Sequence, residues 1–332
     1  MLGTFRFFLA WVVMLSHLPN SPFPLGFNPA VSAVICFYFI SGYLMYFSFY
    51  KEVRKGLSFQ KQILFFYIKR VLRLFPLYLI VLFLTMLVIA IWGPSQMVPL
   101  LHQELGFSKI FLNVLLIFNN YVFDPFIIKP LLPHPLIPPT WSLSTEWHFY
   151  LLVPFFFYLF ARKPLVFVSI LLISMGFEFF AFSHQTGVHL NSDNFGYRYI
   201  FGVLWIFMVG FFYAAGKYRV VLKILYVFVF LFFLSVAFTW STHPFVREIF
   251  LAILFLPFIP KIMRIPFRYD PFFGHLSYPI FLSHFFIFLA LEKLGFTHPG
   301  LGYYWIVFGL VLLFSYGLSL VQKRIDRIRK KF

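Results

Sequence analysis

Apolar residues run along this chain in long blocks, which short polar and basic stretches separate. A helix needs about 20 apolar residues to cross the ~30 Å hydrocarbon core of a bilayer, whereas barrel strands show only weak alternation. The blocks therefore predict an all-α, polytopic membrane protein with about ten spans. The predicted spans are 5–17, 29–50, 66–80, 138–160, 165–182, 199–215, 220–240, 248–260, 272–288 and 303–320.

The composition agrees with this pattern. Hydrophobic residues make up 61% of the chain and charged residues 11%, with a mean hydropathy of +0.88. Soluble domains are about half apolar and about a quarter charged. The net charge of +17 indicates basic cytoplasmic loops rather than a nucleic-acid partner. The single cysteine, Cys36, excludes an internal disulfide and a cysteine-based metal site, and we expect no metal.

The distribution of basic residues predicts the orientation in the bilayer. Lysine and arginine cluster in 51–73, 162–163, 217–223, 261–268 and 323–331. Such clusters favour the cytoplasmic side, which places both termini inside if ten spans cross. An additional apolar segment at 110–121 is too short to cross comfortably, so we expect it to be re-entrant or peripheral. No linker or internal repeat divides the chain, so residues 1–332 are predicted to form a single membrane-embedded domain.

The first predicted span carries Arg6 and His17, which lie eleven residues apart. Eleven residues make almost three helical turns, so both side chains lie on one stripe about 16 Å apart. Ionisable groups inside a membrane are costly and mark candidate functional sites. A flanking arginine and a histidine at the end of the span are the simpler interpretation. Three prolines, Pro19, Pro22 and Pro24, predict a break near His17, and broken helices line cavities, which favours function.

Further polar groups lie at span ends or within spans. The second span contains Ser41 in FYFISGYLM, and the third begins with Lys69, Arg70 and Arg73 in FYIKRVLRLFP. Arg70 and Arg73 share a helix face, and guanidinium groups bind phosphate in a bidentate manner. Both features also have interpretations that need no ligand. Ser41 and Gly42 can serve close helix packing, and the three cations can flank the span on its cytoplasmic side.

Two later stretches carry more polar residues. In PPTWSLSTEWHFYLLVP, Ser142 can cap the helix and Glu146 would then lie in its first turn, where a carboxylate interacts well with the helix dipole. Glu146 is also one of few acids near the membrane. In FFGHLSYPIFLSHFFIF, Tyr278 precedes His284, which lies at mid-span. A buried histidine bonded to a carbonyl is the simpler interpretation of His284.

These stretches resemble the motifs of the acyltransferase family 3 membrane proteins: Arg-x10-His, FFxxSGxL, RxxRxxP, WSLSxExxFYLxxP and GxxSYxxYLxH. The last motif departs from the family at Phe281, which replaces a tyrosine. His148 stands where the family often has glutamine or another polar residue. The WSLSTE stretch is the most specific match, and it agrees at Trp141, Ser142, Leu143, Ser144, Glu146, Phe149, Tyr150, Leu151 and Pro154.

The resemblance implies transfer of an acyl group, most often acetyl, from cytoplasmic acyl-CoA to a carbohydrate hydroxyl. Bacterial members modify surface polysaccharides, lipopolysaccharide or exported glycoconjugates, so the implied location is the bacterial inner membrane. A hydroxyl that attacks a thioester needs a general base, and histidine is the usual one. We therefore expect His17 and Glu146 to be catalytic. The expected acyl-CoA ligands are Arg6, Lys69, Arg70 and Arg73, and the expected supporting or acceptor-binding residues are Ser41, Trp141, Ser142, Ser144, Tyr278 and His284.

A multi-span transporter or flippase for a lipid- or sugar-linked substrate is the alternative. Such proteins also combine many spans, a broken helix and buried ionisable residues. Their interrupted spans usually recur in two matching halves, and this sequence has no such symmetry. The pattern therefore favours the transferase.

Overall fold

The structure, a computed structural model, describes residues 1–18, 21–24, 26–97, 105–120, 135–183, 197–216, 245–297 and 300–332, with single residues between 223 and 234. All regular structure in these residues is helical, so the prediction of an all-α chain is confirmed there. The helices are α1 (Leu2–Ser16), α2 (Pro29–Val53), α3 (Phe59–Trp92), α4 (Phe107–Leu115), α5 (Thr140–Arg162), α6 (Pro164–Ser183), α7 (Ile200–Ala215), α9 (Val246–Phe255), η3 (Leu256–Phe258), α10 (Ile259–Met263), α11 (Asp270–Lys293) and α12 (Leu301–Arg329).

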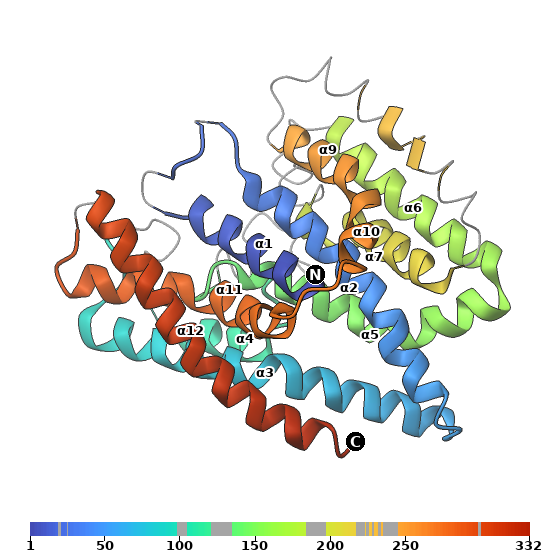
Figure 1. Cartoon of the computed structure of the whole chain (residues 1–332), viewed down its shortest axis with the longest axis horizontal. Helices are drawn as coiled ribbons and strands as arrows, with labels where there is room; N and C mark the ends of the chain where they lie inside the picture. The colour runs from blue at the N-terminus through green and yellow to red at the C-terminus, as the bar shows by residue number, and fades with distance from the viewer. Residues whose placement is uncertain are drawn as a thin grey trace.

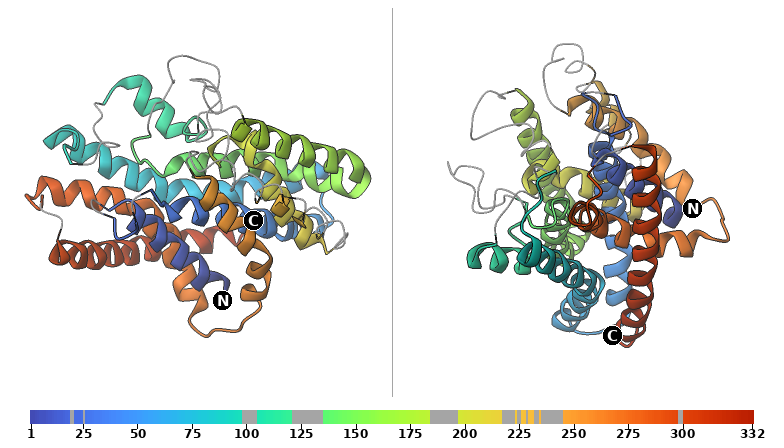
Figure 2. Two further views of the ribbon diagram at one scale, coloured as in Figure 1. Left: turned by 90° about the horizontal axis from the view of Figure 1, so that it is seen from above. Right: turned by 90° about the vertical axis from the view of Figure 1, so that its left-hand side faces the viewer.

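Helix α2 runs through the middle of the helical assembly (Figure 1). It packs against α1, α3, α5, α7 and α9. Helix α11 packs against α1, α3 and α12, and α7 packs against α6. Figure 2 shows the same arrangement from two further sides, with α12 lying beside α3. The chain thus forms two neighbouring groups of helices that share α2.

Several helices have the length and apolar character that a membrane requires. Helices α2, α3, α11 and α12 are long and apolar enough to cross a bilayer, while α1, α6 and α7 are apolar but shorter. This set is that of a multi-pass membrane protein. The number of ten spans and the cytoplasmic termini remain predictions, and the span predicted at 220–240 lies mostly outside the described residues.

Two predicted boundaries agree with the structure and two differ from it. Helix α1 ends at Ser16, so the predicted break near His17 is confirmed. Helix α4 has nine residues, about 14 Å of helix, which agrees with a segment too short to cross. Helix α3 has 34 residues and extends well beyond the predicted 66–80. The predicted span 248–260 is divided into α9, η3 and α10.

The predicted capping of α5 is wrong. The helix begins at Thr140, and its cap residue Pro139 has helical backbone angles of φ −70° and ψ −8°. Proline favours such angles at a helix start, so the helix begins earlier than the serine suggested. Ser142 instead donates its hydroxyl to the Pro139 carbonyl at 3.0 Å. Glu146 lies in the second turn, so its carboxylate is not a first-turn partner of the helix dipole.

Helices α2 and α7 approach each other closely at two glycines. A Cβ atom added at Gly42 would lie 1.9 Å from the Phe207 carbonyl oxygen, and one at Gly210 would lie 2.1 Å from the Phe39 carbonyl oxygen. Small residues let helix backbones meet in this way within membranes. Gly42 therefore serves helix packing, which agrees with the simpler interpretation of the Ser41–Gly42 pair.

We predict that Gly42→Ala destabilises the protein by about 1–3 kcal/mol, because the new methyl group overlaps backbone that cannot move independently. The measurement is thermal unfolding of the purified protein in detergent. Gly176→Ala in α6 is the matched control, since its added Cβ meets no atom within 4 Å. Equal melting temperatures for the two variants would contradict the close α2–α7 contact.

Candidate active site

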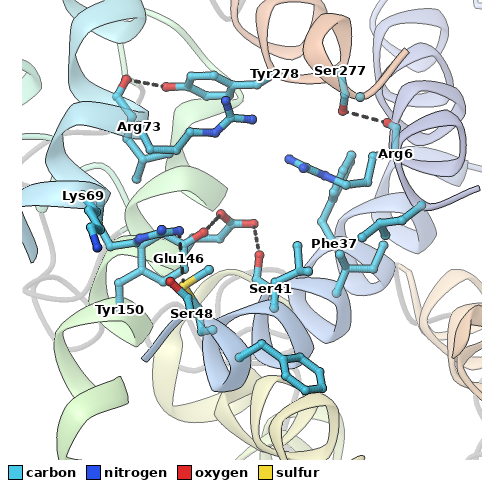
Figure 3. Close-up of a pocket in the computed structure, with 18 of the residues that line it drawn as sticks. Arg6, Phe37, Ser41, Ser48, Lys69, Arg73, Glu146, Tyr150, Ser277 and Tyr278 are labelled. Atoms are coloured by element: carbon cyan, nitrogen blue, oxygen red, sulfur yellow. Dashed lines mark hydrogen bonds between the residues drawn. The ribbon is translucent and has the colours of Figure 1, made fainter. Parts of the chain in front are cut away.

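A cavity of about 810 Å³ lies between α1, α2, α3, α5, α11 and α12 (Figure 3). Its size is that of a ligand site. Polar and charged groups from all six helices reach its wall, which is unusual inside a membrane protein. The basic lining residues are Arg6, Lys51, Lys55, Lys69, Arg70, Arg73, Arg329 and Lys330, and the acidic ones are Glu52, Glu146, Asp270 and Asp326.

Glu146 on α5 lies at the wall of this cavity with two hydroxyl donors. Ser41 of α2 donates to one carboxylate oxygen at 2.8 Å, and Tyr150, one turn further along α5, donates to the other at 2.7 Å. Both bonds are drawn in Figure 3. The expected supporting residue Ser41 thus fixes the expected catalytic carboxylate.

The Arg6 side chain points into the cavity from α1, on the side opposite Lys69 and Tyr150 (Figure 3). Its backbone carbonyl accepts a hydrogen bond from Ser277 of α11 at 2.9 Å. At the start of α1, Asp270 accepts from the amides of Gly3 and Thr4 at 3.0 and 2.8 Å. These amides have no partner within their own helix, so Asp270 acts as a cap from another helix.

The three cations of α3 differ in their partners. Lys69 donates to Glu52 at 2.5 Å, and an Arg73 nitrogen lies 3.9 Å from an Asp326 oxygen. Arg70 lies over the Phe66 ring at 5.6 Å, and its Nε has no hydrogen-bond partner in the part of the chain that the structure describes. Two of the three cations are therefore partly neutralised by carboxylates, and Arg70 retains an unsatisfied buried donor.

Tyr278 lines the cavity while its hydroxyl donates to the Leu74 carbonyl of α3 at 2.7 Å. Ser142 also lines the cavity, although its own hydroxyl turns back to Pro139. Trp141 and Ser144 do not line it. Ser144 donates to the Ile117 carbonyl at 2.9 Å, a contact between α5 and the segment after α4. The indole of Trp141 packs edge-on against Tyr197 at 5.0 Å.

His17 and His284 form a pair outside the cavity wall. The Nδ1 atom of His17 lies 3.2 Å from Nε2 of His284, and His284 is fully buried. Within the described residues, no hydrogen bond joins His17 to Glu146. The structure therefore brings together the two histidines on the one hand, and Arg6, Glu146 and the α3 cations on the other.

Sequence reasoning assigned no role to Tyr150, Glu52, Asp270 or Asp326, all of which line the cavity. Tyr150 follows Glu146 by four residues, a spacing that places two side chains together on one helix face and could have indicated the bond. The other three acquire their positions only from helix packing. In the described residues, no group of three or more histidine, cysteine, aspartate or glutamate side chains is arranged to hold a metal.

Comparison with known proteins identifies the class of this site. Residues 2–320, nearly the whole chain, match the acyltransferase domain of acyltransferase family 3. A protein of Aquifex aeolicus (strain VF5), described as uncharacterized, is 28% identical over 206 residues, covering 58% of this chain and 89% of the relative. No solved structure matches significantly. The chain belongs to acyltransferase family 3 and is therefore an acyltransferase enzyme.

We predict that Glu146→Gln lowers turnover by about tenfold or more and changes the free energy of unfolding by less than about 1 kcal/mol. The amide retains the shape of the carboxylate but not its charge, and both hydroxyl neighbours can reorient toward it. Turnover and melting are measured on the same preparation. Glu248→Gln is the control, since Glu248 is buried on α9, outside the cavity, where it accepts from the Asn28 amide at 2.9 Å. Full turnover of Glu146→Gln would contradict a role for the carboxylate in the reaction.

Proposed function

We propose that the protein transfers an acyl group, acetyl in the simplest case, from cytoplasmic acyl-CoA to a hydroxyl of an exported carbohydrate or glycoconjugate at the bacterial inner membrane. Family membership supplies the reaction class. The observation that carries the donor assignment is the basic cavity with Arg70 in its wall, whose Nε has no hydrogen-bond partner among the described residues. The proposed acceptor is the kind of molecule that members of the family usually modify.

The cavity has the chemistry that the phosphates of CoA require. Arg6, Lys69, Arg70 and Arg73 approach it from α1 and α3. A phosphate group bound there would complete the hydrogen bonds of Arg70 and add charge-assisted bonds to a region with surplus positive charge. Glu52 and Asp326 offset part of that surplus through their contacts with Lys69 and Arg73.

Helix α1 provides the connection between the donor cavity and His17. It is continuous from Leu2 to Ser16, and its cap residue His17 still has helical backbone angles. His17 therefore lies on the same helix face as Arg6, about 16 Å further along. This distance is comparable to the reach of a pantetheine arm, so the nucleotide can stay with the cations while the thioester reaches the histidine.

In the proposed reaction, Nε2 of His17 accepts the proton of the acceptor hydroxyl as the oxygen attacks the thioester carbonyl carbon. A C–O bond forms, and the tetrahedral intermediate collapses with cleavage of the C–S bond. The CoA thiolate leaves and takes up the proton from the imidazolium, which restores neutral His17. No other reactant is required.

Glu146 serves this reaction from the cavity side. Its carboxylate is held by Ser41 and Tyr150 and shares the cavity with Arg6. We propose that it orients a reactant or supports His17 through the bound substrates. Its fixed position gives the preorganisation that such a role needs.

We predict that Arg70→Ala or Arg73→Ala weakens CoA binding, and that lysine at either position restores it only partly, because lysine lacks the planar fork. Calorimetry with CoA measures the effect directly. Arg162→Ala at the end of α5 is the matched control, since Arg162 lies over the Tyr158 ring and does not line the cavity. Unchanged CoA affinity in both cavity variants would contradict the donor assignment.

We also predict that His17→Ala inserts and folds normally but loses acyl transfer by about 10² or more, the scale of a positioned general base. Product formation from acetyl-CoA is compared with the amount of folded protein in the membrane. CoA affinity should be retained, because His17 does not line the cavity. Normal product formation by this variant would eliminate His17 as the base.

A further inference from the structure

We propose that His284 is a positioning residue that holds neutral His17 in its Nδ1–H form, so that Nε2 of His17 is free to accept a proton. This inference rests on the proposed role of His17 as the general base, and it deepens that role. It follows from the hydrogen bonds of the two rings.

The protonation of His284 is set by the backbone of its own helix. Its Nδ1 lies 3.1 Å from the carbonyl oxygen of Ile280, one turn earlier in α11. A carbonyl oxygen can only accept, so Nδ1 of His284 carries the hydrogen. In a neutral imidazole the other nitrogen is then an acceptor, which leaves Nε2 of His284 with a lone pair.

Two acceptors face the His17 ring: this lone pair and the backbone carbonyl of Val13, one turn earlier in α1. Nε2 of His284 faces Nδ1 of His17 at 3.2 Å, so Nδ1 of His17 must be the donor. The hydrogen of neutral His17 is thereby placed on Nδ1, and its Nε2 carries the free lone pair. In a neutral histidine, the hydrogen bond made by one ring nitrogen commonly decides whether the other nitrogen carries the hydrogen.

The ring geometry indicates a direct hydrogen bond rather than a face-to-face stack. The two ring planes are inclined by 10°, and their centroids lie 5.4 Å apart. This separation is close to the sum of the nitrogen–nitrogen distance and the two ring radii. The two nitrogens therefore lie near the line between the ring centres, which is the direction of the N–H bond and the lone pair.

The two histidines cannot exchange roles in this arrangement. His284 is fully buried, and both of its nitrogens are engaged, with the Ile280 carbonyl and with His17. His17 is partly exposed, and its Nε2 is not used in this pair. When His17 gains a proton, its Nδ1–H bond to His284 becomes charge-assisted and stabilises the imidazolium, as the carboxylate does in a serine protease triad.

The test is nitrogen NMR of the full-length protein, labelled with ¹⁵N-histidine, in lipid nanodiscs at a pH where free histidine is neutral. Signals are assigned through their loss in His17→Asn and His284→Gln. We expect both His17 and His284 to be in the Nδ1–H form, whereas the Nε2–H form predominates for free histidine in water. Finding His17 in the Nε2–H form would overturn the proposal, and no turnover is needed for this measurement.

Variants of His284 connect the form of the ring to activity. In His284→Gln, the side-chain oxygen can occupy the place of Nε2 and accept from His17, so we expect the Nδ1–H form and most of the turnover to remain. His284→Leu cannot accept, and we expect mixed His17 forms and a turnover loss of about tenfold or more, with unchanged KM for acetyl-CoA. Equal turnover in the two variants would contradict the positioning role. If His17→Ala retained activity while the NMR result held, the proposed function alone would fail.

Discussion

The seating of α1 against α11 is the contact on which the rest of the site depends. Helix α1 has no side chain of its own at its N-terminal cap, and Asp270 of α11 accepts from its first amides instead. At the same level, a Cβ atom added at Gly3 would lie 2.2 Å from the Asp270 carbonyl oxygen, so the backbones nearly touch. At the other end of α1, His17 meets His284. One helix pair thus places both Arg6 and His17.

Electrostatics explains why the acidic residues of the cavity are where they are. A membrane protein cannot keep several buried cations without partners, because desolvation disfavours isolated charges. Glu52 beside Lys69 and Asp326 beside Arg73 and Arg329 provide local neutralisation at 2.5–3.9 Å. The Nε atom of Arg70 has no hydrogen-bond partner among the described residues. A phosphate group is an anion that can accept a hydrogen bond from it. The cavity therefore keeps a surplus of positive charge that a polyanion can complement.

The sequence predicted the class of fold, and most of the site residues that it predicted line the cavity, for identifiable reasons. Long apolar blocks determine helices in a bilayer, and the Arg-x10-His spacing is a property of one continuous helix. The arrangement between helices could not be predicted in this way. His17 and Glu146 were both expected to be catalytic, but the sequence did not indicate their partners: Glu146 bonds to Ser41 and Tyr150, while His17 meets His284. The start of α5 was misjudged because prolines that precede a serine can themselves begin a helix.

The central claim is that acyl-CoA enters the basic cavity from the cytoplasm and delivers its acyl group to an acceptor on the other side. Sealed membrane vesicles of defined orientation test it most directly. With inside-out vesicles, acetyl-CoA added outside should acylate an acceptor confined to the lumen, and Arg70→Ala should reduce the rate. With right-side-out vesicles, external acetyl-CoA should fail even when external acceptor is present. Efficient use of external acetyl-CoA by right-side-out vesicles would contradict the claim and the orientation on which it rests.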